Sequence, residues 1–308
     1  MKMLRTSANL LLALASFALP ATAAPTLLKF APSPETDYTV RSFSTRTTTL
    51  GDRHIGADTT YRTWECKLRA EGKGWVINSV CTDFQGVRDS LPLDSQVTGL
   101  LVGLKTTMTL DSIGQAITVE GYPELRSKVL TLEDTSAVRQ INEMISPELM
   151  ASKDLDEWNL RLASLVGRQF SVGSVTHQMS EIALPDDAKL MQFELDILLD
   201  TLRFQGRLFA RLMHYADTDP IRLAKTTNRS VGRMAEIFKM PDTLLAHFSE
   251  PVSDYRTTHE MIFDVETLML ASEKIEREVV LRQIQELDRT IFSHLIETTE
   301  KSYIYSRR

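Results

Sequence analysis

The segment MQFELDILLDTLRFQGRLFARL, residues 191–212, decides the fold class of this chain. Apolar and polar side chains alternate along it, and a period of two residues is typical of a β-strand with one buried face. We therefore predict long antiparallel strands here, with one apolar set on either side of Asp200-Thr201 facing a core. Those sets are Met191, Phe193, Leu195, Ile197 and Leu199, followed by Leu202, Phe204, Leu208, Ala210 and Leu212.

The polar positions of this segment carry opposite charges on its two strands. Gln192, Glu194 and Asp196 make the first polar set acidic, whereas Arg203, Gln205, Arg207 and Arg211 make the second set basic. Antiparallel pairing would place Glu194 near Arg207, a cross-strand pair worth about 0.2–1 kcal/mol. We interpret both polar sets as a solvated face of the sheet.

A second hairpin is predicted around the two cysteines. Trp64, Cys66 and Leu68 share one strand face, and Trp75, Ile77 and Cys81 share a face of the next strand. If Lys73 and Gly74 form a two-residue loop, Cys66 lies directly opposite Cys81. Because the chain carries an export signal, as argued below, we predict a Cys66–Cys81 disulfide.

Other segments indicate further strands and a helical insert. Residues 104–120 alternate around the turn Asp111-Ser112-Ile113-Gly114 and predict a third hairpin. Ser146-Pro147-Glu148 is a helix-start signal, and Leu155, Trp158, Leu162 and Leu165 follow at helical spacing until Gly167. We therefore expect helices in an insert around 132–167.

The C-terminal part is ambiguous. Met261, Phe263 and Val265 alternate like a strand, but the apolar positions of 275–297 fit helical spacing about as well. We predict a strand at the start and a helix at the end of this part, and a mobile tail over 303–308.

The resulting fold class is α+β and strand-rich, with antiparallel sheets that are curved or barrel-like and a helical insert around 132–167. We divide the chain into a flexible lead-in at 24–37, a β-rich half at 38–125, a helical insert at 126–184 and a second α+β half at 185–308. The layout resembles exported bacterial proteins whose large curved sheets hold apolar molecules, a resemblance of fold alone.

The first 23 residues form a secretory signal peptide by pattern. Lys2 and Arg5 precede the apolar run LLLALASFAL at 10–19, which Pro20 ends, and Ala21-Thr22-Ala23 matches an A-x-A cleavage site. The run is far shorter than the ~20 residues of a membrane-spanning helix. We predict cleavage near Ala23, a periplasmic or secreted location, and no membrane span in the mature chain.

Composition and motifs exclude several function classes. The formal net charge is −6, and removing residues 1–23 makes it more negative, which disfavours nucleic acid as a partner. The six histidines lie far apart, and no nucleotide loop, nucleophile elbow or zinc signature is present. We therefore predict no cofactor, no metal and no catalytic residue.

Three residues are weak candidates for a ligand site. His214 continues the parity of Leu208, Ala210 and Leu212, so we expect it to point inward. Trp64 and Trp75 could line a cavity for an apolar molecule, although large aromatic side chains on apolar faces more often belong to the core.

Three functions fit these observations. The first is a non-catalytic binding or carrier protein for an apolar ligand, because long strands with one apolar face can enclose such a molecule. The second is an envelope assembly or scaffold protein that acts through contacts with other proteins. The third is a hydrolase of envelope polymers, for which a cluster of carboxylates or histidines would have to converge in one cleft.

Overall fold

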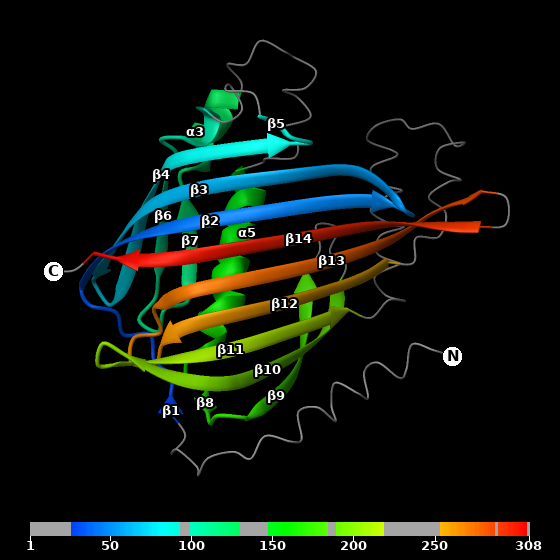
Figure 1. Cartoon of the computed structure of the whole chain (residues 1–308). Helices are drawn as coiled ribbons and strands as arrows, with labels where there is room; N and C mark the ends of the chain where they lie inside the picture. Colours follow the sequence, from blue (N-terminus) through cyan, green and yellow to red (C-terminus); the bar gives the residue numbers. More distant parts are fainter. Residues whose placement is uncertain are drawn as a thin grey trace.

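A computed structural model describes residues 26–92, 99–129, 147–183, 189–218, 253–286 and 289–306. Strands dominate, and helices are few (Figure 1). The strands are β1 (Thr26–Leu27), β2 (Glu35–Leu50), β3 (Arg53–Glu71), β4 (Gly74–Arg88), β5 (Leu91–Pro92), β6 (Lys105–Leu110), β7 (Ala116–Glu120), β8 (Gln169–Phe170), β9 (Val175–Ala183), β10 (Lys189–Phe204), β11 (Arg207–Thr218), β12 (Ser253–Asp264), β13 (Leu270–Glu286) and β14 (Arg289–Tyr305). The helices of the described residues include α3 (Tyr122–Val129), α5 (Pro147–Arg161) and the 3₁₀ turn η2 (Ala163–Leu165).

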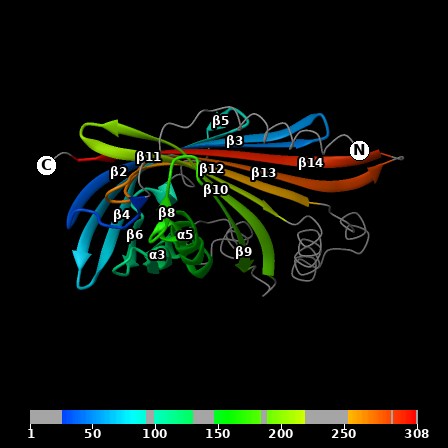
Figure 2. The same cartoon turned by 90° about the horizontal axis from the view of Figure 1, so that it is seen from below.

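One large antiparallel sheet organises the described chain. Its strand order is β7-β6-β4-β3-β2-β14-β13-β12-β11-β10-β9, with β5 beside β4, and β1 pairs with β8 in a separate small sheet. Figure 2 shows β4 and β6 on one side and β9 on the other curving toward the side that holds α3 and α5. The sheet is therefore curved, as predicted, but it is open, with β7 and β9 as the edges of its described part. We call the face toward α5 the helix-side face and the opposite face the outer face.

The main core lies between the helix-side face and the segments that cover it. Leu68, Leu110, Leu212 and Phe263 contribute fully buried side chains from the sheet. The lead-in, predicted to be flexible, instead buries Leu28 and Phe30 in this core. The Phe30 ring meets the rings of Trp75 and Trp158 edge-on, so an aromatic cluster holds the lead-in in place.

The predicted helical insert is found in part. Helix α5 begins at Pro147, as the start signal indicated, and Leu155 and Trp158 pack against the core. The Trp158 indole N–H donates to the carbonyl of Gly114 at 2.8 Å, and the Asn159 amide bonds both backbone groups of Ala116, which anchors α5 on β7. Residues 130–146 lie outside the described ranges, and the segment after α5 contains β8 and β9.

The C-terminal part corrects two predictions. Residues 270–286 and 289–305 form the long strands β13 and β14, so the helix predicted at the end of this part is wrong. Apolar residues four positions apart, such as Ile275 and Val279, fit both the helical period of 3.6 residues and the strand period of two. This segment is β-sheet because β13 pairs with β12 and β14 pairs with β2. The predicted mobile tail is also wrong up to Tyr305, since Tyr303 and Tyr305 pack against the core.

All three predicted hairpins exist, but the hairpin around the cysteines has a different register from the predicted one. Strands β6 and β7 form the hairpin predicted over 104–120. In the β3–β4 hairpin, Glu71 pairs with Gly74, so Gly72 and Lys73 form the loop. Gly72 has the positive φ that this loop position needs, and a side chain at Gly74 would collide with the Leu110 carbonyl, 2.2 Å from its Cβ.

Because the loop lies one residue earlier in the chain, the partner of Cys66 moves by two residues, from Cys81 to Ser79. Cys66 lies opposite Ser79, and Cys81 lies opposite Trp64, so the predicted Cys66–Cys81 register is wrong. Both cysteines are buried free thiols in the structure, and the disulfide is not formed there. Burial raises the pKa of both thiols, so neither is activated as a nucleophile.

The division into two halves is not visible as a break in the sheet. Strands β2–β4 and β6–β7 come from the first half, and β10–β14 come from the second half. Strand β14 pairs with β2, so the two halves meet in the middle of one sheet. The domain boundaries themselves stay a prediction.

Candidate binding surface on the outer face

The two faces of strand β10 are reversed relative to the prediction: the acidic face is buried and the apolar face is exposed. Glu194 and Asp196 are buried, at 5% and 4% relative exposure, whereas Phe193 is 54% exposed. The register shows which side this is. Leu198, Leu212, Met261 and Glu273 lie in one cross-strand row, and Glu273 bonds Arg161 of α5. The acidic set of β10 therefore faces the helix side, and its apolar set faces outward.

Ion pairs explain why the acidic set tolerates burial. The Asp196 carboxylate accepts a hydrogen bond from Arg168 at 2.7 Å and lies 2.7 Å from Nδ1 of His214. These partners compensate the charge that burial would otherwise make costly. The expected pairing of Glu194 with Arg207 is wrong, because the hairpin turns at Gln205-Gly206 and Glu194 lies opposite Ala216.

A β-bulge brings apolar residues from both parts of β10 to the outer face. The register shifts between Leu198 and Asp200, which inserts Leu199 as an extra residue. Without this insertion, the odd-numbered apolar residues before it and the even-numbered ones after it would lie on opposite faces. With it, Leu202 and Phe204 share the outer face with Phe193 and are 65% and 59% exposed.

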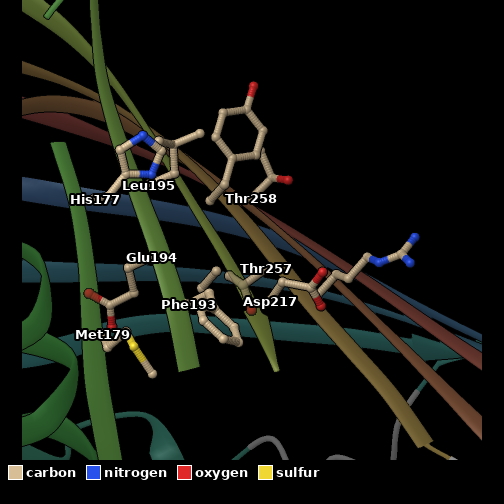
Figure 3. A pocket seen from close by; sticks show the side chains of 11 residues that line it. His177, Met179, Phe193, Glu194, Leu195, Asp217, Thr257 and Thr258 are labelled. Atoms are coloured by element: carbon tan, nitrogen blue, oxygen red, sulfur yellow. The ribbon is translucent and has the colours of Figure 1, made fainter. Parts of the chain in front are cut away.

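A groove of about 560 Å³ crosses β9–β12 (Figure 3). Most of its lining residues have side chains on the outer face, in two adjacent cross-strand rows. One row contains His177, Leu195, Tyr215 and Thr258; the other contains Met179, Phe193, Asp217 and Arg256. The intervening lining residues are Glu194, Ala216 and Thr257.

The lining of this outer-face groove is apolar with a polar end. Met179, Phe193, Leu195 and Tyr215 supply apolar surface, and Met179 supplies a side chain that adapts to irregular shapes. Asp217 and Arg256 lie directly opposite each other at the β11–β12 side. This arrangement is suited to a molecule with an apolar body and one polar group.

A second hollow on the outer face is similar in size but polar. It has a volume of about 550 Å³ and lies over β2, β3 and β12–β14. Charged side chains dominate its walls, with Phe43 and Tyr61 as its aromatic members; the charged ones include Arg41, Glu260, Lys274 and Glu300. It provides an internal comparison for the apolar groove.

On the helix-side face, a buried ionic cluster joins α5 to the sheet. Glu273 is fully buried, and its carboxylate accepts hydrogen bonds from Arg161 at 2.6 and 2.7 Å and from the Tyr303 hydroxyl at 2.7 Å. Lys301 and His259 lie 3.0 and 3.1 Å away. Burial alone would raise the pKa of Glu273, but Arg161 and Lys301 hold it well below its usual range.

This cluster and the Asp196–His214 pair are the described places where a carboxylate meets a histidine within hydrogen-bonding distance. Glu273, His259 and Asp196 are all buried; Glu273 borders the polar hollow on the outer face, but its side chain has 0% exposure and points to the helix side. Within the described ranges, no three or more His, Cys, Asp or Glu side chains are grouped to hold a metal ion. The hydrolase alternative gains no support from this geometry.

The three ligand-site candidates from the sequence lie away from the outer-face groove. His214 points to the helix side as expected, where it contacts Asp196. Trp64 and Trp75 pack against the core. Sequence reasoning missed His177, Met179, Phe193, Leu195 and Tyr215 as groove residues. The alternation of 191–199 was the available signal, but it could not tell which face is buried.

The comparisons with known proteins give no family. No family model matches the chain, and no curated protein matches it. Among solved structures, a structure of lipid–protein interactions in lipovitellin is similar over 91% of this chain and 26% of its own chain, with 9% identity and a TM-score of 0.42. DynF from the dynemicin biosynthesis pathway of Micromonospora chersina aligns over 93% and 90%, with 8% identity and a TM-score of 0.18.

Proposed function

We propose that this protein is an exported, non-catalytic binding or carrier protein that holds an apolar ligand in the outer-face groove. The observation that carries the proposal is the exposed Phe193 and Met179 in a hollow lined largely by apolar side chains. Contiguous exposed apolar surface is uncommon on monomeric proteins and marks sites of interaction. The groove volume falls within the range of about 300–1,000 Å³ typical of small-molecule sites.

The expected ligand is amphipathic. Its apolar body would lie along Met179, Phe193 and Leu195, and its polar group would lie near Asp217 and Arg256, which face each other at one end. Because the groove is open, we expect the ligand to remain partly exposed and to exchange without a large opening of the fold.

The export part of the proposal rests on residues 1–23, which lie outside the described ranges. Their pattern supports cleavage near Ala23 and a periplasmic or secreted location. Within the described ranges, every helix is too short or too polar to cross a lipid bilayer. Mass spectrometry of the protein recovered from the periplasm would give the cleavage site directly.

A fluorescent fatty-acid probe tests the groove. Phe193→Ser removes the exposed aromatic side chain of the groove, and we expect the probe to bind about tenfold more weakly, equivalent to about 1.4 kcal/mol. Phe43→Ser is the matched control, because it makes the same change in the polar hollow on the same face. Equal probe affinity of the wild type and Phe193→Ser would contradict the proposal.

Native mass spectrometry tests whether the ligand accompanies the protein. We expect the gently purified protein to carry an extra mass that is lost on denaturation, and we expect Phe193→Ser to carry less of it. A bare mass for the wild type would favour the scaffold alternative.

A further inference from the structure

The turn between β10 and β11 is an apolar tip flanked by arginines. Leu202 and Phe204 are the apolar residues of the tip, and every residue from 201 to 207 is exposed. The backbone turns at Gln205 and Gly206, which have φ values of 50° and 80°. Both views show this end of the hairpin extending beyond the neighbouring strands (Figures 1 and 2). We call residues 202–207 the hairpin tip.

Two large exposed apolar side chains at a projecting turn need a physical reason. They make no contribution to the core, and their exposure costs solubility. Because the bulge at Leu199 sets their parity, Leu202 and Phe204 point to the same face as the outer-face groove. Ile197 and Leu195 continue this face along β10, with Asp200 between them and the tip, so the groove begins about 30 Å from the tip at 3.3 Å per residue.

The charge of the tip differs from that of the whole chain. The chain has a net charge of −6, yet the tip and the adjoining part of β11 carry three arginines; Arg207 and Arg211 share the outer face with Leu202 and Phe204, and Arg203 lies on the helix-side face. Arg211 pairs with Glu260 at 2.7 Å, and Arg207 lies 3.4 Å from Asp264 with 63% of its side chain exposed. Exposed arginine beside exposed Leu and Phe is the combination that favours an anionic lipid surface.

We propose that the hairpin tip docks on an anionic lipid surface, with Leu202 and Phe204 entering the headgroup region and the tip arginines contacting the anionic groups. This inference deepens the proposed function, because it names the surface from which an apolar ligand reaches the groove. The docking step itself requires only the tip. Since the rest of the chain is acidic, the attachment is local and weakens as salt screens the arginines.

Vesicle flotation with the mature full-length chain tests the docking. The vesicles are pure phosphatidylcholine or an equimolar mixture of phosphatidylcholine and phosphatidylglycerol. We expect the wild type to partition about tenfold more strongly onto the anionic vesicles, and raised salt to remove most of this preference. No partition onto anionic vesicles, or equal partition onto both kinds, would overturn the proposal.

Variants assign the binding to the tip. Leu202→Ser/Phe204→Ser should lower the partition coefficient about tenfold, because two exposed side chains can no longer be buried in lipid. Arg203→Gln should lower it severalfold. Phe43→Ser is the control, since Phe43 is an exposed aromatic residue of the same face far from the tip, and it should bind like the wild type. Wild-type partition of the double variant would refute a role of the tip.

The groove and the tip can fail separately. Leu202→Ser/Phe204→Ser should keep the fatty-acid probe affinity of the wild type, and Phe193→Ser should keep its vesicle binding. A wild type that binds the probe but not anionic vesicles, with probe binding weakened by Phe193→Ser, overturns the tip alone. Unchanged probe binding by Phe193→Ser, with normal vesicle binding by the wild type, overturns the groove alone. Circular dichroism confirms that each variant is folded.

Discussion

Replacing Arg161 by alanine should destabilise the fold much more than breaking a salt bridge of the same length at the surface. Arg161 contacts both carboxylate oxygens of Glu273, which has 0% side-chain exposure. Removing one partner of a buried pair costs about 3–5 kcal/mol, since the other charge is left in a medium of low polarity. Lys301 remains 3.0 Å from Glu273, so we expect the lower end, about 3 kcal/mol.

Arg211→Ala is the matched control. Arg211 and Glu260 are also 2.7 Å apart, but their side chains are 42% and 26% exposed, and such a pair contributes about 0.5 kcal/mol. Urea unfolding followed by tryptophan fluorescence gives both free energies of unfolding, and Trp158 on α5 reports on the element that Arg161 fastens. A cost for Arg161→Ala within about 1 kcal/mol of the control would refute the reasoning.

Two further predictions concern pH and the cysteines. Burial tends to raise the pKa of Glu157, but Arg161 and Lys301 lower it to about 2. The stability that this carboxylate contributes is therefore present above its unfolded pKa of about 4.5 and is lost as the pH falls toward 2. The urea midpoint of the wild type should drop over this pH range, and the midpoint of Glu157→Gln should drop less steeply. An equally steep drop in that variant would contradict the assignment. Both buried thiols should resist iodoacetamide in the native protein and react with it in urea. A protein mass lower by two hydrogens, together with no reaction in urea, would instead establish the Cys66–Cys81 disulfide and require a different β3–β4 register.

Local patterns predicted individual elements well. The alternation of 191–212 correctly indicated strands, the 104–120 pattern gave β6 and β7, and the Ser146-Pro147-Glu148 signal marked the start of α5. Each of these rests on a short-range preference of the backbone. The strand-rich, antiparallel and curved character of the fold followed from them.

The facing of β10 could not be predicted, because it depends on distant partners. Glu194 and Asp196 look like solvent-facing residues until Arg168 and His214 are placed beside Asp196. The bulge at Leu199 then changes the parity of everything after it. Since the outer-face groove depends on this facing, none of the candidates from the sequence, His214, Trp64 or Trp75, lies in it.

An error of one residue in the predicted position of a turn changed the predicted pairing of the strands that follow it. Placing the β3–β4 loop at Lys73-Gly74 instead of Gly72-Lys73 moved the partner of Cys66 by two residues. The acidic and basic stretch around 275–297 offered both periods, and only pairing with strands from distant parts of the chain makes it β-sheet. Registers and pairings of this kind are properties of the assembled sheet.

The pairing of β2 with β14 has a consequence for the order of folding. Ser44 and Thr299, which share a hydrogen bond at 2.9 Å, are 255 positions apart in the chain. A ribosome or an export channel releases β2 long before β14. The edge of β2 that pairs with β14 therefore stays unpaired until the final strand is released. Contacts of such long range slow folding and leave an edge exposed to aggregation. We therefore expect that a chain cut before β14 yields two unjoined sheets, and that cells which make this protein protect it until synthesis is finished.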